Sequence, residues 1–212
     1  MVMTMSSDTE VKVWDPLVRL FHWSLVAAFT IAYVTEDEWQ NLHVWAGYVV
    51  AGLLAFRILW GFIGPQYARF SNFIYSPATV IAYLKDMVTL REKRYLGHNP
   101  AGGVMVLALL ASLALTTLSG MKLYAVEENA GPFANVEINL SPIAVAQADD
   151  DDDDEREGRD QGDEFWEEIH EFFANLTLLL VVLHIAGVRF SSMSHNENLP
   201  RAMVTGKKRR EE

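Results

Sequence analysis

Four long stretches of the chain are almost purely apolar, namely Leu17–Val34, Leu42–Ile63, Val104–Tyr124 and Phe172–Phe190. A helix needs about 20 apolar residues to cross the hydrocarbon core of a bilayer, which is about 30 Å thick. An amphipathic surface helix would carry polar residues along one face, and these stretches do not. The pattern therefore predicts an all-α fold in one domain, a transmembrane up-down-up-down four-helix bundle with spans at about 17–34, 42–63, 102–124 and 168–190.

The connections between these stretches are polar and differ in character. Ser76–Thr89 has the pattern of a short amphipathic helix, begun by a proline, that would lie along the membrane surface. Asn99 and Pro100 suit the cap and the first turn of the third span. Residues 127–164 hold Gly-Pro and Ser-Pro pairs and a run of aspartates, and they predict a long acidic loop that is partly disordered.

The charges predict how the bundle is oriented. Of the seventeen Lys and Arg residues, fourteen lie near the two ends of the chain or between residues 57 and 94. Because Lys and Arg are enriched on the cytoplasmic side of membrane spans, we expect both termini inside and the acidic loop outside, in the periplasm. No small-residue cleavage site follows the first apolar stretch, so we expect it to be retained as a helix.

Composition excludes several kinds of function. The formal net charge of −11 argues against nucleic acid as a partner. The chain has no cysteine, which excludes disulfides, thiolate metal sites and iron–sulfur clusters.

Four of the six histidines fall at the ends of the predicted spans. His22 lies near the inner end of the first span, and His43 lies near the outer end of the second. His170 and His184 lie at the outer and inner ends of the fourth span, about 21 Å apart along a helix and close to one face of it. The up-down topology therefore pairs His43 with His170 on the outer side and His22 with His184 on the inner side.

Ionisable side chains in membrane helices are costly and usually functional. Two neutral imidazoles that face one another across a bundle suit the two axial positions of a haem iron. Gly47 and Gly187 each follow a histidine on the same helix face, where they would let a flat ring approach the backbone. Two alternatives stay open: histidines that only anchor the helix ends, and a histidine-dependent metal transporter. The transporter predicts carboxylates inside the spans, whose interiors contain none.

Several motifs resemble the bacterial cytochrome b561 family, which includes the b-type haem subunit of nickel hydrogenases. They are Val13-Trp14-Asp15-Pro16 with Arg19 and Phe21-His22-Trp23, His43-Val44-Trp45-Ala46-Gly47-Tyr48, Arg57-Ile58-Leu59-Trp60-Gly61-Phe62-Ile63-Gly64 with Tyr67-Ala68-Arg69-Phe70, Tyr95-Leu96-Gly97-His98-Asn99-Pro100-Ala101-Gly102-Gly103, and Glu127-Glu128-Asn129-Ala130-Gly131-Pro132.

The resemblance covers about residues 11–210 and implies a multi-pass dihaem cytochrome b of the bacterial inner membrane. It implies His22, His43, His170 and His184 as the axial ligands of two haem b groups. It also implies electron transfer between the quinone pool, or an inner-membrane redox partner, and a periplasmic protein such as a cytochrome c. The acidic insert at about 149–163 departs from the family pattern, which leaves the outer partner open.

Two arginines and a further histidine are candidates for contacts with such a haem. Arg57 falls on nearly the same helix face as His43, at the depth of the inner pair, and a guanidinium suits a propionate. Arg19, one turn before His22, is a second candidate for a propionate contact. The alternative for Arg57 is a side chain that snorkels to lipid headgroups. His98 is interpreted as a loop histidine near the interface, with a quinone or a propionate contact as the alternative. His195, in the polar tail, is given no role.

Histidine on both sides of an iron leaves no open position for a substrate, so no catalytic residue is predicted and one-electron relay is the expected function. Quinol or cytochrome oxidoreductase activity is compatible with it. The acidic segment 127–171 would steer a basic periplasmic partner, or serve as a solvated spacer. A second hypothesis is a haem-bearing membrane anchor subunit of a periplasmic oxidoreductase or hydrogenase, and the metal transporter is a third.

Overall fold

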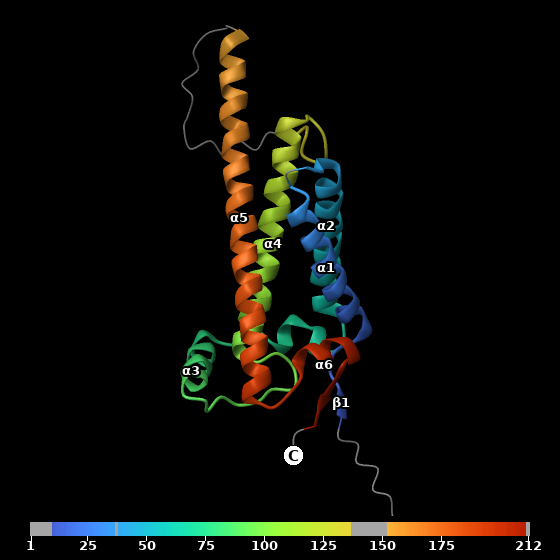
Figure 1. Ribbon diagram of the computed structural model, residues 1–212, viewed down its shortest axis with the longest axis vertical. Helices are drawn as coiled ribbons and strands as arrows, with labels where there is room; N and C mark the ends of the chain where they lie inside the picture. The colour runs from blue at the N-terminus through green and yellow to red at the C-terminus, as the bar shows by residue number, and fades with distance from the viewer. Residues whose placement is uncertain (1–9, 37, 137–151, 211–212) are drawn as a thin grey trace, which may run out of the picture. The chain divides into compact units, whose positions relative to one another are not determined.

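The computed structural model describes residues 10–36, 38–136 and 152–210, and over 152–163 it describes the backbone alone. Its long helices are α1 (Pro16–Val34), α2 (Gln40–Ile63), α4 (Pro100–Glu127) and α5 (Asp152–Ser194), which Figure 1 shows. Each is long and apolar enough to cross a membrane, and in α5 this holds for Glu164–Ser194. The four predicted spans are therefore confirmed as helices.

Most apolar side chains of these helices are not buried inside the protein. The buried share of the most apolar window is 17%, 28%, 17% and 6% for the four spans in chain order. A soluble monomer rarely exposes so much contiguous apolar surface. The helices therefore fit a multi-pass membrane protein whose outer surface contacts lipid.

Short polar residues cap three of the helices, among them Asn99, where the sequence predicts a cap. The Asp15 carboxylate accepts hydrogen bonds from backbone N–H groups in the first turn of α1, at 2.9 and 3.2 Å. Asn99 does the same for α4 at 2.7 Å, and Ser76 for α3 (Pro77–Val88) at 3.2 Å. Because α3 lies within the predicted 76–89 segment, the helix predicted there is confirmed, and its place along the membrane surface stays a prediction.

The prediction of a loop over all of 127–164 is wrong from Asp152 onward. Residues 152–163 are helical and form the first turns of α5. Acidic residues are favoured at a helix N-terminus, where the macrodipole attracts negative charge, and the loop-like composition hid this preference. The earlier part of the aspartate run and the Ser-Pro pair lie outside the described residues.

The described chain divides into two compact units, residues 1–110 with 179–212, and residues 111–178. In the first unit α1 and α2 pack side by side (Figure 1). A two-stranded antiparallel sheet joins β1 (Glu10–Lys12) to β2 (Lys207–Arg209), so the two ends of the described chain meet. The helix α6 (Leu199–Thr205) leads into β2, and two 3-10 turns, η1 (Gln66–Ala68) and η2 (Phe70–Asn72), follow α2.

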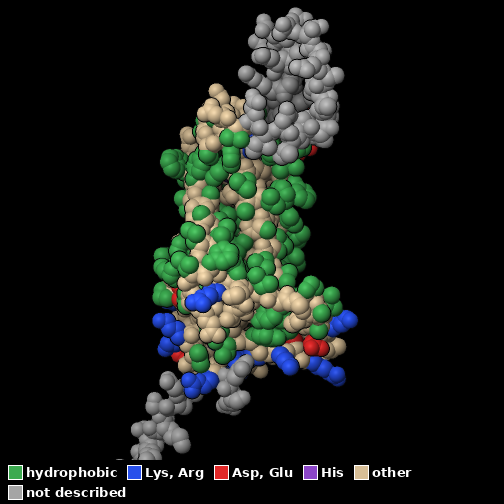
Figure 2. Space-filling view, turned by 180° about the vertical axis from the view of Figure 1, so that it is seen from behind, with side chains coloured by type: hydrophobic (Ala, Val, Ile, Leu, Met, Phe, Trp, Pro, Cys, Tyr) green, Lys and Arg blue, Asp and Glu red, His purple; other side chains and the backbone are tan. Residues whose placement is uncertain are grey.

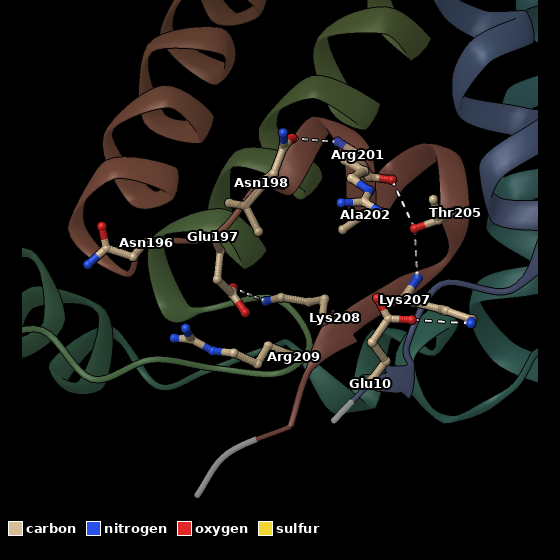
Figure 3. A pocket seen from close by; sticks show the side chains of 11 residues that line it. Glu10, Asn196, Glu197, Asn198, Arg201, Ala202, Thr205, Lys207, Lys208 and Arg209 are labelled. Atoms are coloured by element: carbon tan, nitrogen blue, oxygen red, sulfur yellow. Dashed lines mark hydrogen bonds and ion pairs between the residues drawn. The ribbon is translucent and has the colours of Figure 1, made fainter. Parts of the chain in front are cut away.

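We use the name basic end for the part of the first unit that carries α3, α6, β1 and β2. Figure 2 shows Lys and Arg side chains gathered there, while hydrophobic side chains cover the helices. Glu197 accepts a hydrogen bond from Arg94, and its carboxylate lies 3.2 Å from the Lys208 ammonium (Figure 3). Burial would raise the pKa of Glu197, but these two donors hold it below its usual value. These contacts fix β2 against the connection before α4.

The pocket in Figure 3 has a volume of about 310 Å³ and lies between α6 and β2. Two of its lysines are already paired, Lys207 with Glu10 at 3.2 Å and Lys208 with Glu197. The pocket therefore lies where the two ends of the described chain meet.

A second carboxylate of the basic end, Glu92, is buried beside the end of α5. Its Oε1 accepts a hydrogen bond from the Ser194 hydroxyl, and the His195 ring lies 3.9 Å away. The Ser194 hydroxyl holds the pKa of Glu92 below its usual value, against the effect of burial and with help from His195. His195, to which the sequence analysis gave no role, thus lies beside a buried carboxylate.

In the second unit, hydroxyl groups join α4 to α5. Thr177 is 0% exposed, and its hydroxyl lies 2.7 Å from that of Ser112 and 3.2 Å from that of Thr116. Hydrogen bonds between small polar side chains are a common source of helix association in membranes. These contacts fix the rotation of the two helices within this unit.

Candidate functional site

The predicted inner pair of histidines lies within the first unit. His22 comes from the first turns of α1 and His184 from the last turns of α5. Their ring centroids are 6.5 Å apart, with an interplanar angle of 53°. The Nδ1 atom of His22 is buried and has no hydrogen-bond partner among the described residues.

This spacing fits a bis-histidine haem iron. Two imidazoles that bind one metal ion from opposite sides have ring centres about 6 Å apart, since each nitrogen–metal bond is about 2 Å. The 6.5 Å separation of His22 and His184 is close to that value. The two rings could therefore serve one iron without a large movement of either helix.

His43, on α2, is held by a backbone carbonyl of the neighbouring helix. Its Nδ1 atom lies 2.8 Å from the carbonyl oxygen of Ala32 on α1. A carbonyl only accepts, so the hydrogen must lie on Nδ1, and Nε2 is the nitrogen that a metal ion would bind. Histidines that bind metals almost always donate their other ring N–H in this way.

His170, on α5, shows the same arrangement in the second unit. Its Nδ1 atom lies 3.0 Å from the Thr116 carbonyl oxygen and 3.3 Å from the Ser119 hydroxyl, both on α4. Gly120 makes this approach possible, because a Cβ there would lie 2.7 Å from the His170 ring. The sequence analysis did not identify Gly120. Its position one helical turn after the polar residue Thr116 is a signal that could have indicated a close approach of another side chain. Since His43 and His170 belong to different units, their pairing stays a prediction.

The glycines beside the candidate ligands have free space around them. A Cβ added at Gly47 or Gly187 would meet no other atom within 4 Å. A flat macrocycle needs such room next to the backbone. The residues of the chain therefore fit a haem group at these positions.

Arg57 lies deep in the first unit. The residue is 3% exposed, and its guanidinium carbon lies 5.0 Å and 5.9 Å from the ring centroids of Phe70 and Phe73. Its Nη1 atom is buried and has no hydrogen-bond partner among the described residues. A buried cation normally has an anionic partner, and a haem propionate would supply one. A snorkelling side chain would extend to the lipid headgroups, so the burial of Arg57 disagrees with that alternative.

Arg19 is directed toward the C-terminal part of the chain. Its Nη1 donates a hydrogen bond to the carbonyl oxygen of Val204, while its Nε is buried and has no partner among the described residues. A Cβ at Gly206 would lie 3.4 Å from the Arg19 guanidinium. Arg19 thus ties α1 to the end of α6, and its remaining donor is still available to a propionate.

His98 is more enclosed than a loop histidine at an interface. Its ring lies between those of Trp14 and Phe73, with centroid distances of 4.7 and 4.6 Å. Burial lowers the pKa of His98 to about 3, with a contribution from the Arg57 charge. Only the tertiary structure reveals this position, since the sequence around His98 has the composition of an ordinary connection.

The described residues contain no group of three or more His, Asp or Glu side chains that could hold a metal ion. A haem iron needs only two protein ligands, because the macrocycle supplies the rest. Pairs of histidines without further carboxylates therefore suit haem better than a transported cation.

Comparison with known proteins identifies the family of the chain. The family model of the prokaryotic cytochrome b561 matches residues 13–206. A stretch of 154 residues is 29% identical to the "Probable Ni/Fe-hydrogenase B-type cytochrome subunit" of Rhodobacter capsulatus, and the match covers 58% of this chain and 57% of that protein. The chain thus matches just over half of this relative's length, and no solved structure matches it. Because the family match spans nearly the whole chain and includes all four candidate ligands, the chain belongs to the prokaryotic cytochrome b561 family and is a membrane-bound b-type cytochrome.

Proposed function

We propose that this protein is a dihaem cytochrome b that relays electrons across the bacterial inner membrane. The observation that carries the proposal is the 6.5 Å separation of the His22 and His184 rings, which suits an iron between them. The carbonyl contacts of His43 and His170 support a second, outer site, because they orient both rings as metal ligands. His22 and His184 would hold the inner haem, and His43 and His170 the outer one.

The chain's own residues determine what such haems can do. A bound haem b supplies one-electron transfer. Histidines on both faces of each iron leave no coordination position open to oxygen or a substrate. Arg57 would bind a propionate of the inner haem, and Gly47 and Gly187 would leave room for the rings. These residues therefore favour relay over chemistry on a bound substrate.

The charge distribution supports an orientation with the basic end in the cytoplasm. Lys and Arg gather at that end (Figure 2), where β1 and β2 also join the two ends of the chain. Membrane lipid would surround the apolar faces of the spans. The outer pair and the acidic segment 127–171 would then face the periplasm.

This acidic segment favours a basic redox partner in the periplasm, of the cytochrome c kind. Negative surfaces increase the association rate of positively charged partners, and salt weakens the effect. A quinone, or another inner-membrane redox protein, would exchange electrons with the haems as well. Which of them is the donor depends on their potentials.

A second function is a haem-bearing anchor subunit of a periplasmic oxidoreductase or hydrogenase. It is favoured by the similarity to a protein named as a nickel–iron hydrogenase cytochrome subunit. Such an anchor would remain bound to its enzyme during purification, whereas a carrier would not. A histidine-dependent metal transporter is the alternative of another class, and it would purify without haem.

The test is a reduced-minus-oxidised visible spectrum of the purified protein, with the haem-to-protein ratio. We expect two low-spin b-type haems per chain. A colourless protein from haem-replete cells would overturn the proposal. Stable co-purification of a redox enzyme would favour the anchor function over the carrier.

A further inference from the structure

Phe73 brings together two buried nitrogen groups that lack partners. Its ring is fully buried in the first unit. The Arg57 guanidinium carbon lies 5.9 Å from the ring centroid of Phe73, and the His98 centroid lies 4.6 Å from it. Nη1 of Arg57 and Nδ1 of His98 are both buried and have no hydrogen-bond partner among the described residues.

The position of His98 is fixed from several sides. Its ring packs against Trp14 as well as Phe73. Its backbone carbonyl accepts a hydrogen bond of 3.0 Å from the Tyr75 hydroxyl, which holds the connection before α4. A side chain held in this way can direct a hydrogen bond with little loss of conformational entropy.

His98 is neutral in this environment. Burial is the largest cause that lowers its pKa to about 3, and the positive charges of Arg57 and Lys208 add to it. A neutral imidazole carries one N–H, and its tautomer depends on the partner. Together with the Arg57 guanidinium, which lies near the same Phe73 ring, this N–H would complete a set of donors that matches an anion.

The local carboxylate does not fill this role. Asp15 acts on Arg57 through its charge, but it forms no ion pair with Arg57 among the described residues. Its Oδ1 atom caps α1, and its Oδ2 atom accepts a hydrogen bond of 3.4 Å from the indole nitrogen of Trp60. An unmatched buried donor costs free energy, so the two nitrogen atoms indicate a further acceptor that is not among the described residues.

We propose that His98 and Arg57 form one carboxylate-binding site, and that His98 is a positioning residue for a propionate of the haem held by His22 and His184. This inference rests on the proposed function. His98 packs against Trp14, just before α1, and α1 carries His22 in its first turns, which places the site at the same end of the first unit as the inner pair. The carboxylate would select the tautomer of His98 with hydrogen on Nδ1.

The test compares His98→Phe with His98→Gln. Phenylalanine keeps a ring between Trp14 and Phe73 but removes the donor, whereas glutamine keeps a donor. His195→Gln, at the basic end, is the matched control. The measurements are the midpoint potentials of both haems, by redox titration followed in the visible spectrum, and the haem carboxylate bands in redox-difference infrared spectra.

We expect His98→Phe to keep its haems and to lower the potential of one of them, because a carboxylate without its donor favours the oxidised iron. The carboxylate band of that haem should shift, and His98→Gln should lie closer to the wild type. Unchanged potentials and bands in His98→Phe would overturn the inference and leave the dihaem function intact. If His98→Phe does not assemble, His98→Leu, which also lacks the donor, takes its place, and unchanged potentials and bands in it would overturn the inference. A wild-type protein without haem would overturn the proposed function, and this inference with it.

Discussion

The imidazole rings of His22 and His184 lie 6.5 Å apart, centre to centre, although the two residues stand near opposite ends of the sequence. Replacing either by alanine removes one axial ligand of the proposed inner haem. We expect His22→Ala and His184→Ala each to bind one haem per chain in place of two. The haem-to-protein ratio and the low-spin band of the reduced spectrum measure this.

His195→Ala is the control for this loss, because His195 lies at the basic end beside Glu92. It should keep the full haem content. Retention of both haems in His22→Ala would contradict the assignment of the inner pair.

Gly120 gives a separate test of the outer site. A Cβ at this position would lie 2.7 Å from the His170 ring, so alanine should displace the imidazole from the Thr116 carbonyl. We expect Gly120→Ala to lose or perturb the outer haem and to keep the inner one. Gly52→Ala, whose Cβ would meet nothing within 4 Å, should bind both haems. Identical spectra of the two variants would count against His170 as a ligand.

The buried hydroxyl group of Thr177 should stabilise the second unit. Thr177→Val keeps the shape of the side chain but removes the bonds to Ser112 and Thr116. We expect the free energy of unfolding in detergent to fall by about 1 kcal/mol, the usual size of a hydrogen bond between membrane helices. Thr30→Val is the control, because the Thr30 hydroxyl is exposed and bonds only within α1, to the Val26 carbonyl. Equal stability of the two variants would argue against the interhelical bond.

Arg57 should raise the potential of the inner haem. A buried cation near the iron disfavours the oxidised, more positive state. We expect Arg57→Leu to lower the midpoint potential of one haem, and Arg57→Lys to lower it less. Arg189→Leu, which removes an exposed charge near the end of α5, should have little effect. If Arg57→Leu changes neither potential nor haem content, the propionate contact is wrong.

The Glu92 site predicts a dependence of stability on pH. The Ser194 hydroxyl is the largest cause that lowers the pKa of Glu92 in the folded protein. A lowered pKa stabilises the fold above the unfolded-state value, and this contribution is lost as the pH falls below that value and through the folded one.

Ser194→Ala should therefore unfold at a lower temperature at neutral pH and lose less further stability in acid. Thermal unfolding in detergent from neutral pH downward measures this, with Ser71→Ala as an exposed control. Parallel curves for Ser194→Ala and the wild type would show that this hydroxyl does not set the pKa of Glu92.

The four spans could be predicted from the sequence because a membrane helix must satisfy its backbone hydrogen bonds within itself. An uninterrupted apolar stretch of sufficient length therefore has few other structures open to it. The cap at Asn99 could be predicted for a similar reason, since it bonds to a backbone group only three residues away. The predicted end of the loop was wrong, because α5 begins at Asp152. The acidic composition suggested a solvated loop, whereas the helix dipole favours the same acidic residues at a helix N-terminus.

The sequence by itself determined the helices, the family and the four histidines at the helix ends, because periodicity, length and local motifs carry that information. Only the tertiary structure decided which atoms each histidine contacts. It placed the Ala32 and Thr116 carbonyls beside His43 and His170, and it packed the His98 ring against Phe73. The short strands β1 and β2 likewise exist only because distant residues pair. Such contacts depend on how helices pack and rotate, and residues far apart in a sequence carry no local signal of that.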